Sequence, residues 1–321
     1  MEMCEAQGGM GFCHAGVSKI QRRYNKKLKK LRKNMPKVAV LTDSIVGLPE
    51  AILNNLNIQT VAFYIHRGQE VLRDLVTIQR AEFIQWMLTT KFAPTTACPG
   101  PDDYLKAYEK LAGDGVRDII SIHISSKISG AYQAATVAQS MLKERDPGLR
   151  LEVVDTNNAS MCQGWMVMEA AQAALAGLSL GQVLTVVKKM IPISHMVQTA
   201  DTLKYLYLGG RIGKAQNMLG SLLNIKPLIG VEDGEIVPLG KAHSRRQAYR
   251  QMADIVAGVI GKGKVRIAYV HVGAQEEVEK LKELVEKKVD VVESFLTEFS
   301  PALAVHSGPG TTGLCYYPVD I

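Results

Sequence analysis

The feature that most limits the fold is a regular alternation of short apolar runs with longer amphipathic segments, which begins at Val38. Runs rich in β-branched residues recur as VAVLTD at 38–43, TVAFYIH at 60–66 and DIISIHI at 118–124, and segments with helical spacing lie between them. Strands that are separated by crossover helices usually pair in parallel. We therefore predict an α/β fold whose first part is a mostly parallel sheet with flanking helices.

The pattern changes near residue 193. Helices are expected at 201–210, 214–223 and 245–260, and residues 225–242 should form a hairpin around Asp233-Gly234, because Asp-Gly favours a tight β-turn. The chain then returns to strand, helix and strand. We predict an N-terminal α/β domain at 37–193 and a smaller α/β domain with a mixed sheet at 194–321.

The positive charge of the chain lies in its first 36 residues. They hold nine Lys and Arg against two acids, which is +7, the formal net charge of the whole chain, so residues 37–321 sum to zero. A neutral body argues against nucleic-acid binding. Residues 1–36 are interpreted as a basic extension without fixed structure. A basic helix that touches anionic lipid or RNA is the alternative.

Two further classes of protein are excluded by composition. No apolar run reaches the roughly 18 residues that a membrane span needs, so stable membrane insertion is not expected. The five cysteines are odd in number and contain no CxxC pair. A disulfide framework or a zinc site is therefore not expected, and a reducing cytoplasm fits.

A turn rich in hydroxyl groups follows the apolar run at 119–124. Ser125, Ser126 and Ser129 precede Gly130, and a helix begins at once. The turn matches neither the G-x-S-x-G of a nucleophile elbow nor the G-x-x-x-x-G-K-[ST] of a phosphate loop. Serine hydroxyls and free N–H groups at a helix start can bind an anion. The alternative is a plain serine cap of the helix.

Three other places carry polar groups that could meet a ligand. Thr95 and Thr96 lie in a proline-stiffened loop before a helix, as binding groups or only as turn formers. Arg211 follows a Gly pair, where it can bind a carboxylate or phosphate or fix the loop to backbone carbonyls. His306 begins a glycine-rich loop, as a neutral donor, a proton relay or a structural hydrogen bonder.

Seven strings, in the same order, resemble the DegV family of bacterial fatty-acid-binding proteins. They cover residues 37–321 almost completely. The strings are VAVLTDSIVGLP (38–49), PTTACP (94–99), SIHISSKISGAYQAA (121–135), VVDTNNASMCQG (153–164), LGGRIGKAQNMLGSLLNIKPLI (208–229), VPLGKAHSRRQA (237–248) and HSGPGTTGL (306–314).

The resemblance implies a two-domain carrier that holds a long-chain fatty acid in a tunnel between its domains. It implies no catalytic activity and no cofactor. The carrier presents the acid to a separate ATP-dependent fatty acid kinase, which makes an acyl phosphate for phospholipid synthesis. We accordingly expect a cytoplasmic bacterial monomer with at most transient membrane contact.

The resemblance also assigns roles to particular residues. The carboxylate is expected to meet Thr95, Thr96, Ser129 and the N–H of Gly130, with Arg211 and His306 in the surrounding polar network. Arg245 and Arg246 match a region that faces the kinase. The family commonly has Thr-Ser-Gln-Pro where this chain has Thr96-Ala97-Cys98-Pro99. A hydroxyl and an amide are thereby replaced, and the surroundings of the head group must differ.

Apolar residues on the helical segments are candidates for the wall of the acyl tunnel. We expect this of Met161, Trp165, Met218 and Leu222, since methionine packs adaptably around flexible ligands. An ordinary hydrophobic core is the alternative for each of them.

An enzyme is the alternative function. Ser129 or Ser126 would act as the nucleophile and His306 as the base, in the hydrolysis of a lipid ester or an acyl phosphate.

Overall fold

The computed structural model describes residues 37–90, 92–221 and 225–319, which belong to one compact unit spanning residues 36–321. The predicted extension at 1–36 and Leu222 lie outside the described residues. The α/β class predicted from the alternation of strands and helices is confirmed, and the strands form three sheets.

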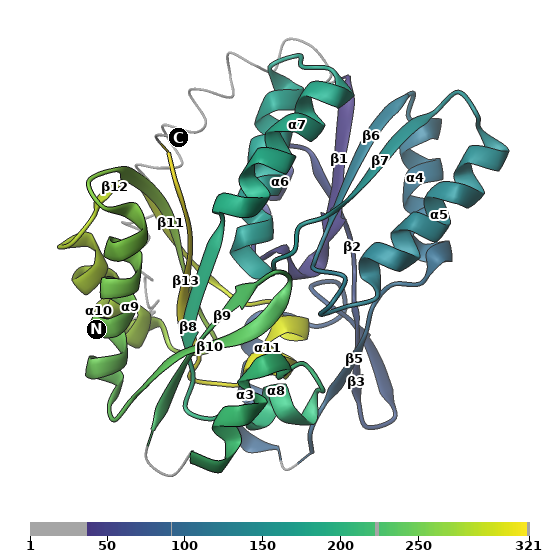
Figure 1. Cartoon of the computed structure of the whole chain (residues 1–321). Helices are drawn as coiled ribbons and strands as arrows, with labels where there is room; N and C mark the ends of the chain where they lie inside the picture. The colour runs from purple at the N-terminus through teal and green to yellow at the C-terminus, as the bar shows by residue number, and fades with distance from the viewer. Residues whose placement is uncertain (1–36, 91, 222–224, 320–321) are drawn as a thin grey trace, which may run out of the picture. The chain divides into compact units, whose positions relative to one another are not determined.

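The first sheet has four strands in the order β2-β1-β6-β7, and every pair is parallel. All residues of β1 and β6 are buried, as in strands covered on both faces. Helices α4 and α5 lie on one face of the sheet, and α6 and α7 lie on the other (Figure 1). These elements are β1 (Val38–Asp43), β2 (Ile58–Val61), α4 (Pro101–Gly113), β6 (Asp118–His123), α5 (Ala131–Arg145), β7 (Arg150–Asp155), α6 (Ser160–Leu175) and α7 (Leu180–Met190).

The second sheet has six strands in the order β10-β9-β8-β13-β11-β12. All pairs are antiparallel except β11 with β12, so the predicted mixed sheet is confirmed. The β9–β10 hairpin turns at Asp233-Gly234, which both have positive φ, as a tight hairpin turn requires. The strands are β8 (His195–Thr199), β9 (Lys226–Glu232), β10 (Glu235–Ala242), β11 (Lys264–His271), β12 (Asp290–Glu298) and β13 (Thr312–Pro318).

Helix α6 lies between the two large sheets. It packs against β1 and β6 on one side and β13 on the other. Twelve of its sixteen residues are buried, which is expected of a helix with sheets on both sides. Helices α9 (Arg245–Ile260) and α10 (Gln275–Glu286) cover the opposite face of the second sheet (Figure 1).

A third sheet joins β3 (Tyr64–Arg67) to β4 (Glu70–Arg73) and β5 (Thr95–Ala97), all antiparallel. The single strand predicted over 60–66 is therefore wrong. The chain leaves the first sheet after β2 and enters the third at β3. Phe63 lies at the crossing, where its N–H donates to Ser44 Oγ at 3.1 Å and its carbonyl accepts from the N–H of Asp74 at 2.9 Å.

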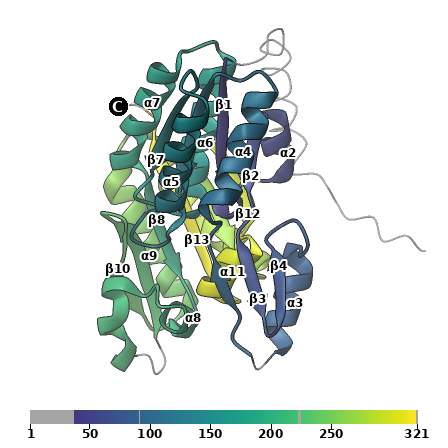
Figure 2. The same ribbon diagram turned by 90° about the vertical axis from the view of Figure 1, so that its right-hand side faces the viewer.

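Short helices complete the described part of the chain. Figure 2 shows α11 between α8 and the third sheet, and α11 also contacts α3. The segment predicted as an α-helix over 214–223 is instead a 3-10 helix over its described residues. The elements are η1 (Ser44–Val46), α2 (Glu50–Asn55), α3 (Arg80–Thr89), η2 (Ile191–Ile193), α8 (Lys204–Leu208), η3 (Gly213–Ser221) and α11 (Pro301–Ser307).

The domain boundary near residue 193 stays a prediction. The two large sheets do use separate parts of the chain, residues 38–155 and 195–318. Residues 36–321 nevertheless group as one compact unit.

Candidate ligand-binding pocket

A pocket of about 290 Å³ opens where the carboxyl ends of β1 and β6 approach the second and third sheets. Its wall is mainly apolar. The apolar lining includes Ile45, Phe63, Ile124, Ile128, Met196, Leu206, Val231, Ile236, Phe299 and Leu303, and the polar lining includes Thr96, Ser129, Ser160, Gln198, Arg211, His306 and Ser307. An apolar wall with a few polar groups is typical of a small-molecule site, and the volume is near the lower end of the usual range.

The three serines of the hydroxyl-rich turn have different surroundings. Ser125 is fully buried, and its Oγ donates to the carbonyl of Gly234 at 2.7 Å. The N–H of Ser126 donates to Asp155 at 3.1 Å. Ser129 alone of the three lines the pocket, next to Gly130, which precedes the first turn of α5. The first N–H groups of a helix have no acceptor within it, so this end of α5 favours an anion.

Strand alternation separates the two predicted threonines. Both lie on β5, where successive side chains point to opposite faces. Thr96 faces the pocket, and its Oγ1 shares a hydrogen bond of 2.8 Å with Nε2 of His306. Thr95 is exposed and does not line the pocket. The structure therefore brings Thr96, Ser129, Gly130, Arg211 and His306 together, without Thr95.

His306 is neutral at pH 7. Burial, together with the positive charge of Arg211, lowers the pKa of His306 from its ordinary value near 6.5 to about 4. Its second ring nitrogen, Nδ1, has no hydrogen-bond partner among the described residues and lies against Gly209. A neutral imidazole beside Thr96 can orient the threonine hydroxyl without adding charge.

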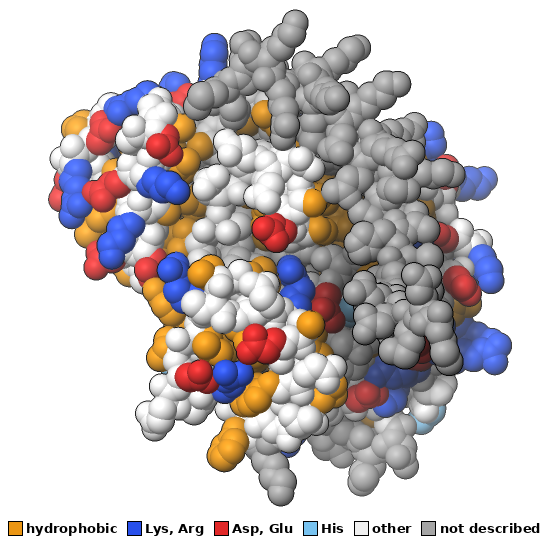
Figure 3. All heavy atoms as spheres, turned by 180° about the vertical axis from the view of Figure 1, so that it is seen from behind, with side chains coloured by type: hydrophobic (Ala, Val, Ile, Leu, Met, Phe, Trp, Pro, Cys, Tyr) orange, Lys and Arg blue, Asp and Glu red, His pale blue; other side chains and the backbone are white. Residues whose placement is uncertain are grey.

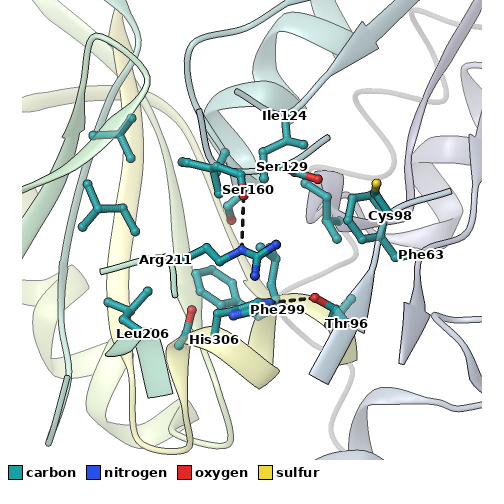
Figure 4. Close-up of a pocket in the computed structure, with 18 of the residues that line it drawn as sticks. Phe63, Thr96, Cys98, Ile124, Ser129, Ser160, Leu206, Arg211, Phe299 and His306 are labelled. Atoms are coloured by element: carbon teal, nitrogen blue, oxygen red, sulfur yellow. Dashed lines mark hydrogen bonds between the residues drawn. The ribbon is translucent and has the colours of Figure 1, made fainter. Parts of the chain in front are cut away.

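Arg211 is held by backbone carbonyls. Its Nε donates to the carbonyl of Ile128 at 3.3 Å, and its Nη1 donates to that of Gly209 at 2.6 Å. Figure 4 shows the guanidinium beside the pocket, between the serine turn and His306. Of the two roles considered for this residue, fixing the loop to backbone carbonyls is present in the structure. The positive charge still faces the pocket.

The helical residues expected along the acyl chain lie elsewhere. Met161, Trp165 and Met218 are buried but do not line the pocket. Trp165 packs between the sheets, where its indole N–H donates to the carbonyl of Cys315 at 3.1 Å. The pocket instead takes apolar side chains from strands and turns, such as Met196 on β8. Strand alternation in HMVQT was the sequence signal for this residue, since it places Met196 and Gln198 on one face.

Cys98 lines the pocket at the position where the sequence departs from the DegV pattern. Its Sγ would be 3.4 Å from a Cβ placed on Gly130, so the thiol sits directly at the start of α5. Burial is the main reason that the pKa of Cys98 is raised, and the thiol is therefore protonated at pH 7.

The two predicted partner-facing arginines differ in their surroundings. Arg245 donates to Asp201 at 2.6 Å and to the carbonyl of Gly310 at 2.9 Å. Arg246 is exposed on the same helix. On the face drawn in Figure 3, basic and acidic side chains are interspersed.

A buried polar network lies behind the pocket and was missed by sequence reasoning. Nε2 of His123 is 2.7 Å from Ser121 Oγ, and its Nδ1 is 2.8 Å from Asp43 Oδ1. The hydroxyl of Tyr104 donates to Asp43, and that of Tyr108 donates to Ser121. Burial acts to raise the pKa of Asp43, but His123 and these hydrogen bonds outweigh it and lower the pKa. The Ser-His-Asp order resembles a catalytic triad, yet all three side chains are fully buried. We assign this network to the core.

The described residues also restrict other kinds of site. None of their His, Cys, Asp and Glu side chains gather in a group able to hold a metal ion. No helix among them has the length and apolar character to cross a membrane.

Comparisons with known proteins all identify the same family. The profile of an uncharacterised protein family, DegV, matches residues 37–319. A DegV domain-containing protein of Listeria innocua is 31% identical over 281 residues, 87% of this chain and 98% of the relative. A Thermus thermophilus structure, described as fatty acid binding of a DegV family protein, has a TM-score of 0.82 at 31% identity. It covers 89% of this chain and 100% of its own. Bacillus subtilis DegV, described as a fatty acid binding protein, has a TM-score of 0.78 at 27% identity, with the same coverage.

Proposed function

Because the chain belongs to the DegV family, we propose that it binds a long-chain fatty acid in this pocket and does not transform it. The observation that carries the proposal is the composition of the pocket wall. Hydroxyl groups and a helix N-terminus lie at one part of it, and apolar side chains make up most of the rest.

The carboxylate is assigned to Thr96, Ser129 and the N–H of Gly130. Two hydroxyls and the start of α5 supply donors for both oxygens, and Arg211 adds a positive charge nearby. Neutral His306 fixes Thr96 through their 2.8 Å hydrogen bond. Thr95 is left out of the proposal because it is exposed.

The acyl chain is assigned to the apolar wall that includes Met196, Leu206, Val231 and Ile236. Burial is worth about 0.8 kcal/mol per methylene, so roughly fourteen methylenes contribute about 11 kcal/mol before the costs of binding. The costs of association subtract several kcal/mol from this gain, so retention of the acid through purification is what the extraction below measures.

Delivery to a fatty acid kinase for phospholipid synthesis is the finer part of the proposal. It is supported by the membership of the family and by an exposed basic residue, Arg246, at the start of α9. In this role the chain is a cytoplasmic bacterial monomer without a cofactor, and it has at most transient membrane contact.

Denaturing extraction followed by mass spectrometry tests the binding. We expect about one equivalent of a long-chain fatty acid from the purified protein, and at least a tenfold loss from the Thr96→Val/Ser129→Ala double variant, because the carboxylate loses two donors. Ser126→Ala is the matched control, since Ser126 lies in the same turn but does not line the pocket. An empty extract, with no uptake of added palmitate or oleate, would contradict the proposal.

The hydrolase alternative has no support from the geometry. His306 Nε2 is bonded to Thr96 rather than to a serine, and Ser126 does not line the pocket. We expect no turnover of chromogenic esters or of an acyl phosphate. Turnover that Ser129→Ala abolishes would establish the enzyme instead.

A further inference from the structure

Three residues in the wall of the same pocket have a buried polar atom without a hydrogen-bond partner among the described residues. One of these atoms is Nδ1 of His306, which lies against Gly209, and the other two are unexplained so far. They are Oγ of Ser160, a residue that is 1% exposed, and Oε1 of Gln198, a residue that is 4% exposed. The large majority of buried side-chain polar atoms in native proteins have a hydrogen-bond partner. Other unpartnered atoms lie outside the pocket, such as Oγ1 of Thr199, but these two are on residues that line it, and a ligand is the group that could meet them there.

The fold holds both side chains at the pocket. Ser160 is the first residue of α6 and has a φ of 53°, and Figure 4 shows it among the lining residues. Gln198 lies on β8 two residues after Met196, so both point to the same face of the strand, and both line the pocket. Neither polar group belongs to the set that we assign to the carboxylate.

The chemistry of the pair identifies the missing group. An amide oxygen only accepts, so its partner must be a donor, and a carboxylate has no hydrogen to offer. A serine hydroxyl both donates and accepts. An alcohol satisfies both kinds of group, whereas a methylene satisfies neither and leaves each buried without a partner, at full cost.

We propose that the pocket selects long-chain fatty acids that carry a hydroxyl group on the chain, which Ser160 and Gln198 recognise. The inference rests on the proposed function and names its ligand class. The same polar groups discriminate against a plain saturated acid, because a site that hydrogen-bonds a hydroxyl rejects the analogue without it.

Calorimetric titration of the delipidated full chain tests the preference. The probes are stearic acid and a set of hydroxystearic acids that differ only in the position of the hydroxyl. We expect at least one isomer to bind about tenfold more tightly than stearic acid. Ser160→Ala and Gln198→Met should each remove most of this difference, and each should bind stearic acid several-fold more tightly, since an unmet polar group has been removed from the wall.

Thr199→Val is the matched control. Thr199 follows Gln198 on β8, and its Oγ1 is also buried without a partner among the described residues, but it does not line the pocket. Its removal should leave the preference intact. Thermal melting checks that each variant is folded. If the positive φ makes Ser160→Ala unstable, the Gln198→Met variant alone still tests the preference for a hydroxyl group.

The outcomes separate the two proposals. If stearic acid binds and every hydroxystearic acid binds no more tightly, the hydroxyl preference is wrong and fatty acid binding stands. A preference that survives both substitutions also overturns the assignment. If no acid binds at all, the proposed function fails, and the inference fails with it.

Discussion

At the scale of single residues, the site depends on contacts that leave little free space. Gly209 ends α8 with an ordinary φ, but a Cβ at this position would collide with Nδ1 of His306. His306 in turn holds Thr96. The missing side chain of Gly209, whose carbonyl also accepts from Arg211, is therefore needed to keep the carboxylate donors in place.

Gly209→Ala should weaken the site without straining the backbone. The added methyl group would push His306 away from Gly209 and disturb its bond to Thr96. We expect a lower melting temperature and at least a severalfold loss of extracted fatty acid. Gly258→Ala on α9 is the control, because a Cβ there meets nothing within 4 Å. Equal melting temperatures and equal fatty acid content in the two variants would contradict the argument.

The buried imidazole of His306 also predicts a dependence of stability on pH. Its pKa is about 4 in the folded chain and about 6.5 when exposed, so the unfolded chain binds the proton more readily. The contribution of neutral His306 to the free energy of unfolding is complete above pH 6.5 and is lost as the pH falls towards 4. Between pH 7 and pH 5 this residue alone should cost about 2 kcal/mol.

Urea unfolding of the delipidated protein at pH 7 and at pH 5 measures this change in the free energy of unfolding. Burial also lowers the pKa of His195 and His271, so their protonation contributes over the same pH range. The comparison is therefore with His306→Gln, in which the fall in unfolding free energy between pH 7 and pH 5 should be smaller. An equal fall in both proteins would show that His306 does not contribute.

At the scale of elements, helix α6 links the two large sheets. Gln163 on its first turns donates to Thr42 Oγ1 at 2.9 Å and to Asp43 Oδ2 at 3.2 Å, both at the end of β1. Two residues further on, Trp165 contacts Phe295 and Tyr317 of the second sheet. The apolar character of this helix therefore stabilises the fold, and the pocket lies beside it.

Trp165→Phe should separate stability from binding. The substitution removes the donor to the carbonyl of Cys315 and leaves part of the space unfilled, which should cost about 1–3 kcal/mol of unfolding free energy. The content of extracted fatty acid should stay the same, because Trp165 does not line the pocket. Trp86→Phe, at a partly exposed position on α3, is the control and should cost less. A selective loss of fatty acid would restore Trp165 to the acyl wall.

The sequence was informative where a local pattern decides structure. The apolar runs of β1 and β6 and the Asp233-Gly234 turn were predicted correctly, because burial and turn geometry depend on adjacent residues. Residues 60–66 were read as one strand, since the crossing at Phe63 depends on its bond to Ser44 in another part of the chain.

The candidate site was predictable in its types of residue and less so in its geometry. The local pattern selected the hydroxyl-rich turn, and only the family resemblance singled out Ser129 within it. The pattern alone could not exclude Ser125, whose hydroxyl donates to the carbonyl of Gly234 on a distant hairpin. It could not separate Thr95 from Thr96, because the loop was not recognised as a strand. The network of Asp43, Ser121 and His123 was missed, since these residues meet only through the pairing of β1 with β6.

At the scale of the whole molecule, all described residues that line the pocket lie between Ile45 and Ser307. The charge of the chain lies elsewhere, because residues 1–36 carry the whole net charge of +7. Binding of the fatty acid and electrostatic attraction to anionic surfaces should therefore depend on different parts of the sequence.

Removal of the residues before Met35 tests this separation. The shortened chain should melt at the same temperature and yield the same amount of fatty acid, whereas retention on heparin and on anionic vesicles should be lost. If the shortened chain bound heparin as tightly as the full chain does, the attraction would belong to the body. A loss of fatty acid would mean that the extension contributes to the site.

The position of α6 has a consequence for how the molecule is divided. A cut near residue 193 would leave this helix with the first sheet and expose the side that carries Trp165. The second sheet would lose the surface that covers β13. The second half keeps the core that its strands form with α9 and α10, but both halves lose cover where α6 meets β13. Each half should therefore be less stable alone than in the whole chain and prone to associate through the exposed apolar face. The two halves are in this sense dependent on each other, since the face that each would expose alone is the face that the other covers.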